Sequence, residues 1–230
     1  MKNVLGNAQV LGDAVVSGNA QVLGDAVVSG KAQVLGDAVV SGKARVSGDA
    51  QVFDNAQVFG NAEVFGNAQV LGNALVSGNA WVSGNAQVSG DAWVRDNAQV
   101  SGDAIVFGNA RVSGDAWVRD NAQVFDNALV SGNAQVSGNA RILGNAQVFG
   151  DARVSGAADI LLLGPASSSN NYTTAHKDSV MGVRINCGCF TGTIAEFEVA
   201  IARTHANNDV FRKEYIAFAA CIRAKFQIWD

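Results

Sequence analysis

The sequence has few of the residues that most often carry chemistry at neutral pH. It contains two histidines and three cysteines in 230 residues, and both histidines, His176 and His205, lie in the last third of the chain. The long stretch before them therefore lacks the usual general base and the usual imidazole ligands of zinc. We expect no catalytic residue, no metal and no cofactor there.

Long apolar runs and clustered positive charge are also missing. The formal net charge is −4, and the scattered Lys and Arg residues provide no basic surface for a phosphate backbone. The first residues enter the repeat directly, without the apolar core of a signal peptide or a bilayer-spanning segment. Three cysteines are an odd number, which suits a reducing compartment. We expect a cytoplasmic protein that binds neither nucleic acid nor membrane.

What the sequence does contain is a six-residue phrase, Ala-x-Val-x-Gly-Asn/Asp, that repeats without insertion from Val4 to Leu161. Ala and Val alternate with the x residues, so they share one face of a short strand. The Gly-Asn, Gly-Asp or Asp-Asn pair supplies a corner, since Gly and Asn tolerate left-handed backbone conformations. A helix needs apolar residues at three- and four-residue spacing. The phrase instead predicts stacked coils, as in a parallel β-helix.

The phrase Val-x-Gly-Asn-Ala-x resembles the hexapeptide repeat of left-handed parallel β-helices. That resemblance implies a triangular coil of three hexads and about nine coils. Together with Gly-Cys-Phe-x-Gly-Thr at Gly188–Thr193 and Glu-Phe-Glu at Glu196–Glu198, it resembles the YdcK-like repeat proteins of bacteria and phages, and more distantly the polymer-forming bactofilins. The expected fold is an all-β solenoid over residues 1–161 with a small α+β cap over residues 162–230.

The tail, residues 162–230, predicts short strands at Tyr172–His176 and Gly182–Asn186. A capping box from Thr193 to Glu196 predicts a helix that reaches about Thr204. Asn207-Asn208-Asp209 is a second start signal, and the helix expected after it carries an apolar stripe of Phe211, Tyr215, Phe218, Ile222 and Phe226. Because an open last coil exposes strand edges, we expect this tail to cap the solenoid. An alternative is that the stripe joins a partner chain.

Sorting the outward residues at eighteen-residue intervals gives three unlike faces. One stacks serines beside Trp81 and Trp117, and another is mixed and places Arg111 one coil from Trp93, at cation–π spacing. The third stacks glutamines beside an apolar column of Leu35, Phe53, Leu71, Phe107, Phe125, Leu143 and Leu161. A continuous apolar column exceeds what a soluble monomer usually exposes. We expect a second copy to cover it, giving a dimer or trimer; folding back of the C-terminal segment is the alternative.

The residues argue against several kinds of chemical site. The hexapeptide acyltransferases that this repeat resembles use a His base and usually an extruded loop, and neither occurs in the repeat. Cys187, Cys189 and Cys221 with the two histidines lack a standard zinc spacing, and buried reduced thiols are expected instead. The Asp residues at the corners are explained by turn chemistry better than by calcium.

The sequence therefore favours a non-catalytic structural scaffold or protein-interaction module that self-associates through its Leu/Phe column. Three alternatives stay open: a filament-forming protein that stacks through its first coil, a transferase with an inter-subunit site that uses His176 or His205, and a phage-encoded inhibitor or ligand-sequestering protein. An unidentified protein partner is compatible with each of them.

Overall fold

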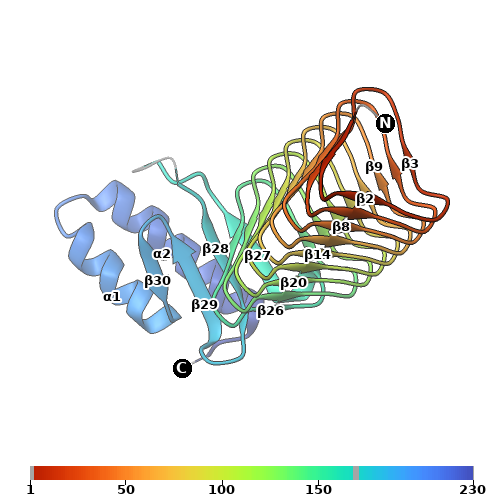
Figure 1. The fold of residues 1–230 in the computed structure, drawn as a ribbon. Coiled ribbons are helices and arrows are strands. Elements are labelled where there is room, and N and C mark those ends of the chain that lie inside the picture. The colour runs from red at the N-terminus through yellow and green to blue at the C-terminus, as the bar shows by residue number, and fades with distance from the viewer. Residues whose placement is uncertain (1–2, 168–170, 230) are drawn as a thin grey trace.

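The computed structural model describes residues 3–167 and 171–229, which form a long prism of stacked coils closed at one end by a small sheet and two helices (Figure 1). Three parallel sheets make the sides of the prism. Within the described residues they hold nine, nine and eight strands, so the solenoid has between eight and nine turns. The expected parallel solenoid with a C-terminal cap is confirmed.

The strands of the prism are short and succeed one another from sheet to sheet. The first sheet contains β1 (Val4–Gly6), β4 (Gln21–Gly24), β7 (Val39–Val40), β10 (Gln57–Val58), β13 (Leu75–Val76), β16 (Trp93–Val94), β19 (Arg111–Val112), β22 (Leu129–Val130) and β25 (Gln147–Val148). The second contains β2 (Gln9–Val10), β5 (Val27–Val28), β8 (Arg45–Val46), β11 (Glu63–Val64), β14 (Trp81–Val82), β17 (Gln99–Val100), β20 (Trp117–Val118), β23 (Gln135–Val136) and β26 (Arg153–Val154). The third contains β3 (Val15–Val16), β6 (Gln33–Val34), β9 (Gln51–Val52), β12 (Gln69–Val70), β15 (Gln87–Val88), β18 (Ile105–Val106), β21 (Gln123–Val124) and β24 (Arg141–Ile142).

Each strand pairs in parallel with the strand three places further along the chain. Gln51 lies opposite Gln69 and Val52 opposite Val70, and the same register recurs around the prism. One coil is therefore three hexads. The inward Ala and Val residues from Ala20 to Ala140 are fully buried, which stacks like on like and excludes water from the interior.

The two residues of each corner have separate roles. The first one, usually Gly, has a left-handed backbone, as at Gly78 with φ of 72°. Asp replaces Gly at Asp54, Asp96, Asp120 and Asp126 and keeps the left-handed conformation. Its carboxylate compensates, because Asp54 Oδ2 accepts a hydrogen bond of 3.1 Å from the Gly72 N–H of the next coil. The tolerance of Asn for this conformation is therefore not what places it at the corner, because the left-handed residue is the first one, Gly or Asp, and Asn is the second.

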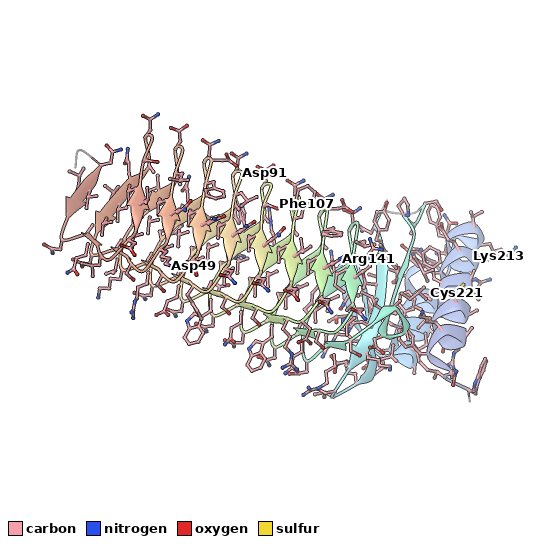
Figure 2. The ribbon with its side chains drawn as sticks, turned by 90° about the vertical axis from the view of Figure 1, so that its right-hand side faces the viewer. Asp49, Asp91, Phe107, Arg141, Lys213 and Cys221 are labelled. Atoms are coloured by element: carbon pink, nitrogen blue, oxygen red, sulfur yellow. The ribbon has the colours of Figure 1, made fainter. Side chains whose placement is uncertain are left out.

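The second corner residues form side-chain ladders that run along the prism edges (Figure 2, where Asp91 marks one edge). In each rung an Asn Nδ2 donates to the Oδ1 of the residue one coil later, as from Asn61 to Asn79 at 3.0 Å and from Asn79 to Asn97 at 3.0 Å. Asn97 then donates to Asp115 at 2.8 Å. A carboxylate accepts but cannot donate. A ladder can therefore end at an Asp but cannot pass through one.

The cap is an antiparallel sheet of β27 (Ile160–Leu163), β28 (Thr173–Asp178), β29 (Gly182–Cys187) and β30 (Phe190–Gly192), with α1 (Ile194–Thr204) and α2 (Asp209–Phe226) packed on it. The predicted capping box is confirmed, since the Thr193 N–H donates to Glu196 Oε2 at 2.8 Å and the Glu196 N–H donates to Thr193 Oγ1 at 3.4 Å. In the part of the chain that is described, neither helix combines the length and the apolar character that crossing a bilayer requires.

The cap covers the last coil of its own chain. The repeat phrase continues in the sequence to Leu161, but the last parallel strand is β26, and a short 3₁₀ turn at Ala157–Asp159 redirects the chain into β27. The Gln147 N–H donates to Thr174 Oγ1 at 2.9 Å, and Asn186 Nδ2 donates to the Gln147 carbonyl at 3.2 Å. Side chains of the cap sheet thereby satisfy backbone groups of the final coil, which would otherwise lack partners.

Candidate functional site

The predicted Leu/Phe column lies along the outside of the third sheet, at the position that follows each strand. We call this surface the Leu/Phe face and define it by Leu35, Phe53, Leu71, Phe107, Phe125 and Leu143. Phe107 is 50% exposed and Leu143 36% exposed, whereas the other four are half-buried. The rings of Phe107 and Phe125 meet edge to face with centroids 6.3 Å apart. The face is therefore an apolar ridge (Figure 2, Phe107), interrupted at Ser89.

Leu161 does not belong to this face, contrary to the expectation from its eighteen-residue spacing. It lies on β27, opposite Ala175 of β28, and packs against the cap core. The chain leaves the coil after Val154, so the spacing no longer reports a position on the prism. The glutamine column beside the face is present, and Gln69 Nε2 donates to Gln51 Oε1 at 3.3 Å.

The apolar stripe of α2 packs mainly inside the cap. Tyr215 and Ile222 are buried, Phe218 and Phe226 pack against the same core, and Phe211 is half-buried. Tyr215 meets Phe197 of α1 edge to face at 6.2 Å. The stripe therefore holds α2 to its own sheet, which is the role that a cap requires.

His176 is enclosed between the cap sheet and the solenoid and is fully buried. Its Nδ1 lies 3.1 Å from the Lys177 carbonyl, and its Nε2 lies 3.1 Å from Asn186 Nδ2. A carbonyl accepts and an amide nitrogen donates, so these partners fit a neutral ring with its proton on Nδ1. Burial lowers the pKa of His176 below its ordinary value, and the Lys177 carbonyl opposes that effect. The geometry suits a structural histidine.

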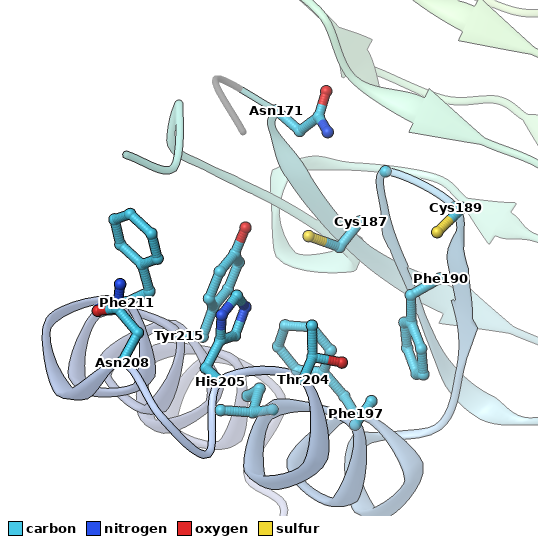
Figure 3. Close-up of a pocket in the computed structure, with 13 residues that line it drawn as sticks. Asn171, Cys187, Cys189, Phe190, Phe197, Thr204, His205, Asn208, Phe211 and Tyr215 are labelled. Atoms are coloured by element: carbon cyan, nitrogen blue, oxygen red, sulfur yellow. The ribbon is translucent and has the colours of Figure 1, made fainter. Parts of the chain in front are cut away.

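His205 lies elsewhere, at the wall of a cleft of about 490 Å³ in the cap (Figure 3). The cleft lies among α1, α2 and the β29–β30 turn, and its lining includes Phe190, Phe211 and Asn208. The His205 ring is stacked on Tyr215, with centroids 5.0 Å apart and planes 12° apart. Among the described residues, those that line the cleft include no carboxylate, lysine or arginine. His205 therefore has no charged group there to activate it as a base.

The three cysteines do not assemble a metal site. Cys187 and Cys189 line the same cleft, whereas Cys221 lies on α2 and is exposed. The described residues contain no group of three metal-ligating side chains. The expectation of buried thiols was wrong for Cys189 and Cys221, which are exposed, and Cys187 is half-buried, with Thr173 Oγ1 3.1 Å from its sulfur.

Aromatic side chains are prominent on the other two sheets. The predicted cation–π contact is confirmed, since the Arg111 guanidinium lies 4.9 Å from the centre of the Trp93 ring on the first sheet. On the second sheet Trp81 is 46% exposed and Trp117 39% exposed. The predicted division of the prism into three chemically different faces is therefore correct.

Two structural groups escaped the sequence reasoning. The corner ladders were not predicted, although the sequence contains a signal for them: no corner Asp is followed by another Asp eighteen residues later. The Asp178–Arg184 pair also escaped. Asp178 accepts from the N–H groups of Val180 and Met181 and from Arg184 Nε at 2.7 Å, and only the folded sheet brings these groups together.

Comparison with known families supports the repeat assignment. The family model described as the YdcK β-solenoid repeat matches residues 68–84, 98–114, 106–120, 122–135, 134–148 and 146–158. A search of curated proteins finds no match to the chain. All the matched segments lie on the prism, which folds as a parallel solenoid. The matched segments and the parallel solenoid together support a YdcK-like repeat β-helix.

Proposed function

We propose that this protein is a non-catalytic scaffold that self-associates through the Leu/Phe face. The observation that carries the proposal is the apolar ridge on the third sheet, which keeps Phe107 half exposed on a flat, regularly hydrogen-bonded surface. A β-solenoid repeat protein fits a structural or interaction role, because its rigid side presents the same positions at a fixed interval. Apolar side chains in such a row gain free energy when a second surface removes them from water.

The size of the face agrees with a weak or moderate contact between two copies. Strands about 4.8 Å apart place Leu35 and Leu143, which are six strand steps apart, roughly 29 Å from each other. A stable interface buries about 800 Å² on each partner. A single apolar column of this length therefore fits a weak or moderate contact that also covers the glutamines beside it.

The proposal assigns no catalytic residue. His176 is fully buried with both ring nitrogens near partners, and His205 is stacked on Tyr215 in a cleft whose described lining residues carry no charge apart from His205 itself when protonated. Neither environment supplies the oriented, charged partner that activates a histidine for acyl transfer. This supports the scaffold over the transferase with an inter-subunit site.

The test is a triple variant, Phe53→Ser, Phe107→Ser and Phe125→Ser, studied by sedimentation velocity. Serine already occupies the same column at Ser89, so the substitutions preserve the repeat. We expect a closed oligomer for the original protein and a monomer for the variant. Phe59→Ser is the matched control, because Phe59 is 37% exposed at the equivalent position of a different sheet. A monomeric original protein, or a variant of unchanged mass, would overturn the proposal.

A further inference from the structure

The second sheet of the prism carries a surface that the self-association proposal does not use. Its outward column runs Trp81, Gln99, Trp117 and Gln135 on β14, β17, β20 and β23, with each residue opposite the next in the parallel register. The two tryptophans are two strand steps apart, about 9.6 Å. Trp81 is 46% exposed and Trp117 39% exposed. We call these four residues the Trp/Gln platform.

Neighbouring side chains restrict both rings. Phe65 meets Trp81 edge to face with centroids 6.0 Å apart, and the Arg119 guanidinium lies 5.8 Å from the centre of the Trp117 ring. Each strand is also hydrogen-bonded to the coils before and after it, as in the 2.9 Å bond from the Trp81 N–H to the Ala98 carbonyl. The protein would therefore lose little conformational entropy when a partner binds to the platform.

The side chains in the two columns around the rings are mostly polar and uncharged, whereas the corners that adjoin them carry the exposed carboxylates of Asp103, Asp115 and Asp120. The column beside the platform contains Ser83, Ser101, Arg119 and Ser137, and Arg119 is the one charged residue in this stretch of the two columns. The nearest charges within the strand column are Glu63, which lies 3.9 Å from Arg45, and Arg153, which donates to Gln135 at 3.0 Å. Such a surface complements an uncharged partner that is rich in hydroxyl groups. The corner carboxylates disfavour a polyanion, and the two columns themselves offer a polycation no row of acidic side chains.

We propose that the Trp/Gln platform binds a neutral linear polysaccharide. The C–H groups on the face of a sugar ring carry partial positive charge, because each carbon bonds to oxygen, and they are attracted to the negative face of an indole. The amides of Gln99 and Gln135 and the hydroxyls of Ser83 and Ser101 can exchange hydrogen bonds with the sugar hydroxyls. A regular polymer places alternate rings at a constant interval, so one chain can contact both tryptophans.

The geometry disfavours an extended peptide on the same surface. A peptide strand gains affinity by pairing its backbone with a free sheet edge. Here the backbone groups of β14, β17 and β20 are already paired with the neighbouring coils. A flat face with fixed rings and neutral polar groups instead suits a partner that binds through its own ring faces and hydroxyls.

Binding is measured by titrating the full chain with cellohexaose, mannohexaose and xylohexaose while the tryptophan fluorescence and the heat of binding are recorded. The variants are Trp81→Gln and Trp117→Gln. Gln is the residue that the repeat itself places at this position in Gln99 and Gln135, so the fold is preserved. Trp93→Gln is the control, because Trp93 is a similarly exposed tryptophan that lies on the first sheet, away from the platform.

We expect at least one of the three sugars to bind the original protein and the Trp93 control equally. Each platform variant should bind it roughly tenfold more weakly, which corresponds to one lost aromatic contact. No binding of any of the three sugars, or binding that survives both platform variants, would overturn the proposal. A changed oligomeric mass in Trp81→Gln or Trp117→Gln would assign the tryptophans to a protein contact and would overturn it as well.

Discussion

Replacing Asn97 by Asp tests the rule that a corner ladder cannot pass through a carboxylate. Asn97 accepts from Asn79 at 3.0 Å and donates to Asp115 at 2.8 Å. Asn97→Asp keeps the first bond, removes the second and places two carboxylates one coil apart. Asn79→Asp is the matched control in the same column, because its neighbours are Asn61 and Asn97. It also removes one donor but creates no pair of like charges.

The expected magnitude follows from the spacing. Two charges about 4.8 Å apart repel by roughly 0.9 kcal/mol in water, and more where the effective dielectric constant is lower. Both corner residues are exposed, so the lower value applies. The lost bond to Asp115 adds up to about 1 kcal/mol. We expect Asn97→Asp to lower the free energy of unfolding by about 1–2 kcal/mol and Asn79→Asp by about 0.5 kcal/mol.

The assay is urea unfolding followed by circular dichroism, at low salt and in 1 M NaCl. The Debye length falls to about 3 Å in 1 M salt, so the difference between the two variants should shrink there. Equal midpoints for Asn79→Asp and Asn97→Asp at low salt would refute the reasoning, as would a difference that salt does not change. Either result would mean that the ladders accompany the coil without stabilising it.

Three further predictions concern the cap junction and the corners. Burial raises the pKa of Asp159, but its bonds to Lys177 and Ser155 outweigh burial and lower the pKa to about 2. The stability that results from this lowered pKa is present above about pH 4, the ordinary pKa of Asp, and is lost as the pH falls toward 2. Hydrogen exchange of the Ser155 backbone N–H should become faster across that pH range. An unchanged exchange rate would contradict this prediction. Burial also lowers the pKa of His176, so the urea midpoint should fall as the pH drops below about 6.5, and His176→Gln should reduce that dependence. Gly78→Ala places a Cβ 2.8 Å from the Asp96 nitrogen at a φ of 72°. Gly182→Ala has a similar φ of 73°, but apart from its chain neighbours no described atom lies within 4 Å of the added Cβ. Thermal unfolding should show a loss of about 1 kcal/mol for Gly182→Ala and a larger one for Gly78→Ala.

The sequence predicts the prism well because the residues of each hexad determine its strand and its corner locally. Ala and Val on one face, and Gly at the corner, require no knowledge of distant residues. The role of the second corner residue was missed because its partner lies in another coil: Asn61 is understood only when Asn79 is seen beside it. Within a single hexad Asn and Asp look interchangeable, whereas along a column the Asn residues donate in series and the series ends at an Asp.

The cap was predicted less completely for the same physical reason. The two helices carry their own start signals at Thr193 and Asn208, and both were found. The fate of Ile160–Leu163 depends on β28, which pairs with it from further along the chain, so the repeat phrase alone placed Leu161 on the wrong surface. The arrangement around His176 depends on Asn186, ten residues away on the adjacent strand, and no local motif announces it.

The unbroken register of eighteen residues also determines how such a chain can change its length. Adding or removing a whole coil lengthens or shortens the prism by about 4.8 Å and leaves every later side chain on its original face. Adding a single hexad turns all the later faces by one third of a revolution, so Phe107 and Phe125 would lie on a different side from Phe53. The length of the prism can therefore change only in whole coils of eighteen residues if its surfaces are to stay aligned.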